Sequence, residues 1–377
     1  MSRPFLRLSG PHHTRGFTLI ELMVAMALSL LLLGLTFSLF QQLNNASDLV
    51  STMADVNENL RVAVNTVARD LSTAGSEIPQ GGIPIPTGGT ATLINRPGPP
   101  GKGLTFPPLP LTTIPVITPG DALGPAQGTI TTDIVTIISV NELSQLDEYT
   151  LTAVSNTLTS ASVTVNTATC GWGSPASACP VGFTAANSQV TPGQLIMLTN
   201  VNGSCLLTAT AVSLTTGVIT FANGNPYDVL GVNQFNGPTS GTIVQLKTGG
   251  AYPSTTAYAI NMVTYYLDTS IPNHQLMRVT PQQFQAGTPQ VMARGINVLQ
   301  FAYSLSPPAS PTDPDGWATT DSTSTPPWGT YAPNTIRKVC LWIIATADHP
   351  NPGTKQVYTK EIATSLTIQN LAYYNKY

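Results

Sequence analysis

The feature that most constrains this chain is an uncharged run of 19 residues near its start, from Leu22 to Phe40. As an α-helix with a rise of ~1.5 Å per residue, this run would be about 28 Å long. That length nearly matches the ~30 Å hydrocarbon core of a bilayer. Residues 1–16 before it contain three arginines and no acid. Because basic flanks stay on the cytoplasmic side, the sequence predicts one membrane-spanning helix with the rest of the chain outside.

A single acidic residue, Glu21, stands at the start of the apolar run. A carboxylate next to hydrocarbon is costly, so such residues usually have a partner and a function. Cleavage after Gly16 would turn the amino group of Phe17 into a cation four residues before Glu21, on the same helix face. The partner could equally be the amino group of a neighbouring subunit. An ordinary secretory signal is not expected, because no small-residue cleavage site precedes Gln41.

The sequence RGFTLIEL, from Arg15 to Leu22, together with the apolar run resembles the class III leader of type IV pilins and type II secretion pseudopilins. In that family, prepilin peptidase removes the leader after the glycine and methylates the new N-terminal residue. The resemblance implies that Gly16 is the cleavage position and Phe17 the mature N-terminus. It also implies that Glu21 is the glutamate that serves assembly.

Beyond the apolar run, hydrophobic residues continue at helical spacing, among them Leu43, Val50, Leu60 and Leu71. Gly75 then supplies the kind of stop that helices favour. We therefore expect one helix from Thr18 to Ala74, roughly 85 Å long. Its transmembrane half, 17–40, should lie in lipid or in a filament, and its amphipathic half, 41–75, should pack against a globular head.

The rest of the chain predicts a β-rich head, which makes the fold class α+β and pilin-like. Thr, Val, Ile and Tyr abound, and only 9% of the residues are charged. Between Pro79 and Pro125, 12 prolines and 9 glycines in 47 residues exclude a regular helix and disfavour central strands. We expect an extended loop over 76–128, packed on the head or, alternatively, a disordered linker. The head itself is expected over 129–377, with strands at 133–140, 162–166, 194–200, 206–213, 217–221, 242–246, 257–267, 275–280, 296–303, 337–345 and 359–369.

Segments of the head also resemble those of PilW-type minor pilins, namely 67–75, 132–136, 192–196, 263–267, 276–278 and 336–343. By analogy with that family, the chain takes part in type IV pilus assembly, in the complex that primes or tips the pilus. The implied partners are prepilin peptidase, other minor pilins, the major pilin, a tip adhesin and inner-membrane lipid. The head would lie in the periplasm and later in the extracellular pilus. A type II secretion pseudopilin and a membrane-anchored adhesin head stay open as alternatives.

Four cysteines follow the membrane segment: Cys170, Cys179, Cys205 and Cys340. Three pairings are possible. The short Gly/Pro/Ser loop between the first two favours a 170–179 disulfide, and a 205–340 disulfide would then tie a middle strand to a late one. Alternatively, Cys340 is simply a small buried hydrophobic residue. A metal site is not expected, because the sequence has no C-x-x-C pair and no Cys/His cluster.

No arrangement of catalytic residues is visible in the sequence. Once the leader is removed, His274 and His349 are the remaining histidines, and neither has a recognisable Ser or Asp frame around it. We therefore expect a protein that is not an enzyme and has no cofactor. The net charge of −3 becomes more negative when the leader arginines are lost, which disfavours direct contact with nucleic acid.

Overall fold

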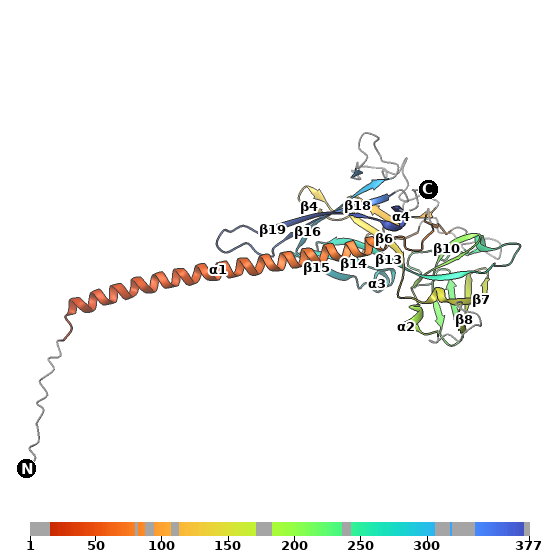
Figure 1. The fold of residues 1–377 in the computed structure, drawn as a ribbon, viewed down its shortest axis with the longest axis horizontal. Coiled ribbons are helices and arrows are strands. Elements are labelled where there is room, and N and C mark those ends of the chain that lie inside the picture. The colour runs from red at the N-terminus through yellow and green to blue at the C-terminus, as the bar shows by residue number, and fades with distance from the viewer. Residues whose placement is uncertain are drawn as a thin grey trace, which may run out of the picture.

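The computed structural model describes residues 16–79, 82–86, 94–106, 113–170, 183–235, 243–305, 317–318 and 336–372. One long helix leaves a β-rich head, and the N-terminal end of this helix lies far from the head (Figure 1). The α+β architecture expected from the sequence is confirmed.

The helix α1 spans Leu19–Ser72. Its 54 residues make it about 81 Å long. The predicted limits, Thr18 and Ala74, differ from the observed ones by at most two residues. Gly75 turns the chain away in the left-handed region, with φ 75°, and its N–H donates to the carbonyl of Ile138 at 2.9 Å. A side chain there would meet Val116, which explains why a glycine follows the helix.

One face of the C-terminal half of α1 is buried against the head, through Val56, Leu60, Ala63, Val67 and Leu71. The predicted apolar face was correct at Leu60 and Leu71 and wrong at Leu43 and Val50, which are exposed. Leu43 lies in the stretch 16–44, where every residue is exposed, whereas Val50 lies on a face of α1 that the head does not cover, although the neighbouring Leu49 is half-buried. The side chains of Leu43 and Val50 therefore have no core to enter.

The described strands of the head form three larger antiparallel sheets and two two-stranded ones, and the central sheet, with seven strands, is the largest. Its long middle strand, β13, pairs with β9, β14 and β6, while β10, β15 and β3 lie at its margins. The bounds are β3 Ile117–Gly120, β6 Ile134–Val140, β9 Leu195–Asn200, β10 Gly203–Thr208, β13 Thr256–Asp268, β14 Gln275–Val279 and β15 Gln290–Arg294.

Two four-stranded sheets flank the central sheet. The distal sheet has the order β11-β12-β8-β7, and the C-terminal sheet has the order β17-β16-β18-β19. The bounds are β7 Tyr149–Asn156, β8 Ser160–Cys170, β11 Ala211–Ser213, β12 Val218–Ala222, β16 Ile296–Leu305, β17 Trp317–Ala318, β18 Ile336–Thr346 and β19 Thr359–Thr367. The remaining elements are short: β1 Ile83–Pro84, β2 Thr113–Ile114, β4 Ala126–Gln127, β5 Ile130–Thr131, the 3-10 helices η1 Leu146–Glu148 and η2 Val244–Leu246, and the helices α2 Ala185–Ser188, α3 Pro281–Ala286 and α4 Gln369–Ala372.

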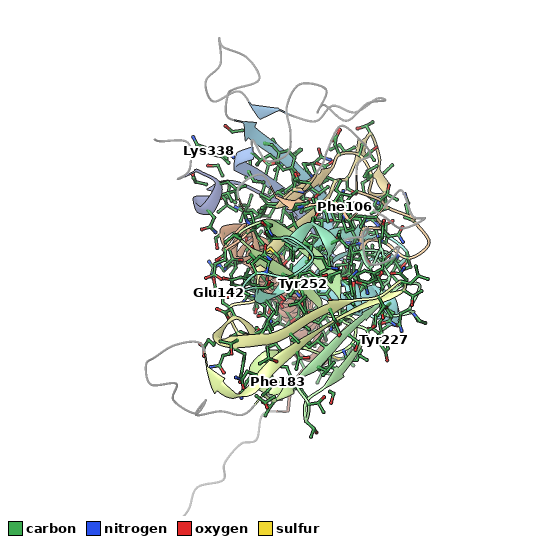
Figure 2. The ribbon with its side chains drawn as sticks, turned by 90° about the vertical axis from the view of Figure 1, so that its right-hand side faces the viewer. Phe106, Glu142, Phe183, Tyr227, Tyr252 and Lys338 are labelled. Carbon is green, nitrogen blue, oxygen red and sulfur yellow. The ribbon has the colours of Figure 1, made fainter. Side chains whose placement is uncertain are left out.

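The three sheets enclose separate cores. The largest lies between α1, the C-terminal sheet and the adjoining part of the central sheet. A second core lies between the distal and central sheets, where the rings of Tyr149 and Phe183 meet edge to face with centroids 5.4 Å apart. Figure 2 shows Phe183 and Lys338, a residue of β18, on opposite sides of the head. The helix α1 packs on the C-terminal sheet and on β15 of the central sheet.

Two predicted strands were wrong. The segment 206–213 is not one strand, because β10 ends at Thr208 and the chain crosses to the distal sheet as β11. Where β10 ends, the side chain of Asn233 forms hydrogen bonds with the backbone of Thr208. Its oxygen accepts from the N–H of Thr208 at 2.9 Å, and its amide nitrogen donates to the carbonyl of Thr208 at 2.8 Å. In the segment 242–246, the described residues form the 3-10 helix η2, whose Leu246 is buried.

The described parts of the Pro/Gly-rich segment lie against the head and bury Ile83, Ile94, Phe106 and Ile114. This segment also supplies β3, although it contains Pro119. Among the described strands β3 pairs only with β6, so it lies at the edge of the sheet, where a residue without an N–H is tolerated.

Candidate functional site

The first candidate site is the junction between the leader and α1. Gly16 and Phe17 precede the helix, both are exposed, and 86% of the Phe17 surface is accessible. Thr18 is the N-cap residue, with extended backbone angles. The predicted cleavage position therefore lies just outside the helix, in exposed chain that a peptidase can reach.

Glu21 is held by the N-cap residue. Its Oε2 accepts hydrogen bonds from the backbone N–H and the hydroxyl of Thr18, both at 3.0 Å. The hydroxyl oxygen of Thr18 in turn accepts from the N–H of Glu21 at 3.3 Å. This reciprocal capping box stabilises the first turn of α1. The expected partner of Glu21 was an amine alone, although the spacing T-x-x-E before an apolar run predicts this cap.

The N-terminal half of α1 is an apolar surface without any cover in the described chain. α1 is long and apolar enough to cross a membrane, and none of its most apolar segment is buried. Hydrophobic side chains of this kind occur in lipid or in contacts with other helices. Its place at the N-terminus, directly after the junction, supports membrane anchoring.

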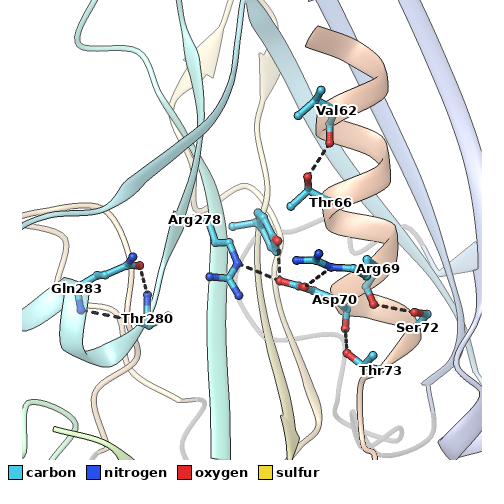
Figure 3. Close-up of polar contacts among 10 residues, drawn as sticks. Val62, Thr66, Arg69, Asp70, Ser72, Thr73, Arg278, Thr280 and Gln283 are labelled. Carbon is cyan, nitrogen blue, oxygen red and sulfur yellow. Dashed lines mark hydrogen bonds and ion pairs between the residues drawn. The ribbon is translucent and has the colours of Figure 1, made fainter. Parts of the chain in front are cut away.

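The other half of α1 is fixed to the central sheet by an ion pair (Figure 3). Asp70 Oδ2 accepts from Arg278 Nε at 3.0 Å and from the hydroxyl of Tyr265 at 2.7 Å. Burial, with the nearby Asp70 carboxylate, raises the pKa of Tyr265, so that its hydroxyl stays a donor. On the solvent side, Arg69 Nε lies 3.7 Å from Asp70 Oδ1. The sequence offered no signal for this contact, because its members are 195 and 208 residues apart.

We expect Asp70→Ala to lower the free energy of unfolding by about 2 kcal/mol, because Arg278 and the Tyr265 hydroxyl would keep their burial and lose their acceptor. The matched control is Arg69→Ala, which removes the exposed partner of the same carboxylate. This variant should change the free energy of unfolding by less than about 0.5 kcal/mol. Urea unfolding of the full chain in detergent measures both. Equal effects of the two variants would contradict the assigned roles.

A second polar cluster is buried behind β3 and β6. The side chain of Arg96 donates to the hydroxyl of Thr136 at 2.6 Å and to the carbonyl of Pro119 at 2.8 Å. Burial lowers the pKa of Arg96 to about 10. Asp133 accepts from the N–H groups of Ala122 and Phe301, yet burial raises its pKa to about 7, with a contribution from Asp121. The cluster fixes the Pro/Gly-rich segment to the central and C-terminal sheets.

The raised pKa of Asp133 predicts a pH dependence of stability. Between 3.8, its ordinary value, and about 7, the folded chain binds a proton that the unfolded chain has released. The free energy of unfolding should therefore fall as pH rises through this interval, by up to about 1.4 kcal/mol per pH unit. Asp133→Asn should flatten the slope, whereas Asp48→Asn, on the exposed face of α1, should leave it unchanged. Urea unfolding at several pH values tests this, and an unchanged slope in Asp133→Asn would refute it.

The predicted 205–340 disulfide is wrong, since both residues are free thiols. Cys205 is fully buried in the core between the central and distal sheets, and burial raises the pKa of its thiol. Cys340 belongs to β18 of the C-terminal sheet, on the strand face opposite Val339 and Leu341. The two strands contribute to different sheets, so their side chains do not meet. The pairing of Cys170 with Cys179 falls on side chains outside the described residues and stays a prediction.

The described chain gives no sign of a metal or catalytic centre. None of its residues form a group of three or more His, Cys, Asp or Glu side chains placed to hold a metal ion. His274 contacts the side-chain oxygen of Asn297 through Nδ1 at 3.0 Å, and no acid or nucleophile joins them in any described hydrogen bond. The junction and the two halves of α1 are therefore the features from which a function can be argued.

Comparison with known proteins identifies the same region. Residues 11–37 match the model of the prokaryotic N-terminal methylation motif. No curated protein and no solved structure matches the chain. The motif covers the arginine before the junction, Gly16, Phe17, Glu21 and most of the apolar run. The chain thus begins with the methylation motif of type IV pilin-like and pseudopilin proteins, which prepilin peptidase processes.

Proposed function

We propose that this chain is a minor pilin of the PilW type, which prepilin peptidase cleaves between Gly16 and Phe17 and which then enters a type IV pilus, in its priming or tip complex. The proposal rests on two features that occur together. The methylation motif at 11–37 overlaps the part of α1 whose apolar side chains are exposed, and the C-terminal half of the same helix packs on a β-rich head. A bare apolar helix requires lipid first and neighbouring helices after extraction from the membrane.

In this proposal, the precursor sits in the inner membrane with its arginines in the cytoplasm and its head in the periplasm. Cleavage frees the amino group of Phe17, which replaces the Thr18 contacts of Glu21 within the same subunit or a neighbouring one. Its partners are prepilin peptidase, other minor pilins and the major pilin, and the head is available to a tip adhesin. The role is structural, without catalysis, cofactor or direct contact with nucleic acid.

Deletion and complementation of the gene test the proposal. Deletion should abolish surface pili. Because a priming or tip subunit is needed in few copies, the chain should be a minor component of pili sheared from the complemented strain. Export of secreted enzymes should be unchanged. Pili in normal number after deletion would contradict the proposal.

The alternative that the motif equally allows is a subunit of a type II secretion pseudopilus. That role predicts the opposite pair of results, with enzyme export lost and pili retained. A membrane-anchored adhesin head predicts that sheared filaments lack the chain although it remains in the membrane fraction.

A further inference from the structure

The connection between β18 and β19 carries a turn of fixed shape, which we call the hairpin tip, residues 348–357. The side-chain oxygen of Asn351 accepts from the N–H groups of Gly353 at 2.8 Å and Thr354 at 3.0 Å. The backbone of Lys355 donates to the carbonyl of Asn351 at 2.8 Å. These bonds close the turn on itself, so the tip has a definite position and does not trail loosely from the sheet.

The hairpin tip lies against α1 where the bare part of the helix ends. A Cβ placed on Gly353 would be 3.9 Å from Asn45 Nδ2. Asn45 is partly covered, whereas all residues from 16 to 44 are exposed. On the other side of the tip, Asp348 and His349 border a cleft of about 260 Å³ shared with α1. Figure 1 shows this loop reaching further along α1 toward its N-terminus than the rest of the head that is described.

The height of the tip above the apolar run follows from helix geometry. Asn45 is five residues beyond Phe40, which is about 7.5 Å along the axis. The polar headgroup layer on each side of a bilayer is about 5–8 Å thick. With Leu22–Phe40 across the hydrocarbon, the tip lies at the level of the headgroups.

We propose that the hairpin tip binds the phospholipid headgroups of the outer leaflet while α1 is inserted, as a second membrane contact of the head. The proposal rests on the membrane insertion of α1 and not on the type of filament that the chain enters. A single helix leaves the head free to rotate about the helix axis. A second contact displaced from that axis sets the rotation and limits the tilt of the head.

The chemistry of the tip suits this layer. Lys355 lies in the turn and is exposed, and an exposed ammonium group can meet lipid phosphates. Val357 is 44% exposed and offers an apolar side chain to this layer, whereas the following Tyr358 packs against the core of the head. Asp348 lies on the same tip and offsets the charge of Lys355, so that the formal net charge of residues 348–357 is zero with His349 neutral. We therefore expect binding to anionic bilayers that is helped by Lys355 and does not depend on charge alone.

The test uses the full chain in vesicles of phosphatidylcholine and phosphatidylglycerol, with tryptophan introduced at one of three positions. Val357→Trp reports on the tip, Leu33→Trp on insertion of α1, and Leu158→Trp on an exposed turn of the distal sheet. Lipids brominated near the headgroup quench nearby tryptophan. Relative to the parent chain, whose own tryptophans give the background, we expect quenching and a blue shift for Val357→Trp and none for Leu158→Trp. For Leu33→Trp we expect quenching by lipids brominated deep in the acyl chains.

Each other outcome overturns a defined part of the account. If Leu33→Trp is quenched and Val357→Trp is not, α1 inserts but the tip does not bind lipid. If Leu33→Trp is not quenched, the membrane anchoring on which the proposal rests fails as well. A blue shift of Val357→Trp without quenching would indicate contact with a second protein chain and would also refute it. Adding Lys355→Glu to Val357→Trp should reduce the quenching, whereas the matched change Lys102→Glu should not, and equal effects would remove the lysine from the contact.

Discussion

Replacing Gly16 with valine should abolish removal of the leader, so that the chain keeps its full length in cells that contain prepilin peptidase. The cause does not lie in the fold of the chain, since nothing is within 4 Å of a Cβ placed on Gly16. The residue also lies outside α1, so helix stability is unaffected. A side chain at this position therefore acts on the peptidase, which must accommodate the residue before the cleaved bond. Immunoblotting for the mature size measures the result.

Gly34 offers the matched control. It also has nothing within 4 Å of its Cβ position and lies in the bare half of α1. Gly34→Ala should be processed like the parent chain. Normal maturation of Gly16→Val would show that the cut lies elsewhere and would remove the assignment of Phe17 as the mature N-terminus.

Loss of the Glu21 carboxylate should leave cleavage intact and reduce incorporation into filaments roughly a hundredfold. In the uncut chain the carboxylate is satisfied by Thr18, at 3.0 Å from both its N–H and its hydroxyl. Cleavage places a cationic amine nearby, and in Glu21→Ala this amine enters an apolar environment without a counter-ion. An uncompensated buried charge costs about 3 kcal/mol or more, which corresponds to the stated factor. Quantitative mass spectrometry of sheared filaments against the membrane fraction measures it.

Thr18→Val separates the two roles of Glu21. This variant removes the hydroxyl of the N-cap residue, at a cost of about 1 kcal/mol in helix stability, and keeps the carboxylate. We expect it to be cleaved and incorporated nearly as well as the parent chain. Equal losses for Thr18→Val and Glu21→Ala would mean that capping of α1, and not pairing with an amine, is what assembly requires.

The course of α1 could be predicted from the sequence because its determinants are local. A charge-free run, helical spacing and a glycine stop are each visible within a few turns of helix. Which face is buried was harder to predict, since Leu43 continues the apolar pattern before the head begins and Val50 continues it on a face that the head does not cover. The strand β7 was missed for a related reason. Its residues are mostly exposed or half-buried, so they carry little apolar alternation.

Contacts between distant parts of the chain could not be predicted. Asp70 and Arg278 are 208 residues apart, and Arg96 and Thr136 belong to segments whose pairing depends on the sheet topology. The cysteine prediction failed for the same cause, because sequence spacing does not say which sheet a strand joins. The Thr18–Glu21 cap, by contrast, is local and was predictable from its spacing.

The measurement that tests the central claim most directly is the intact mass and N-terminal fragment spectrum of the chain isolated from cells with prepilin peptidase. The account predicts a chain that begins at Phe17, carries one methyl group on its amino nitrogen and lacks residues 1–16. A chain that still begins at Met1, or that begins at a residue after Phe40, would contradict it.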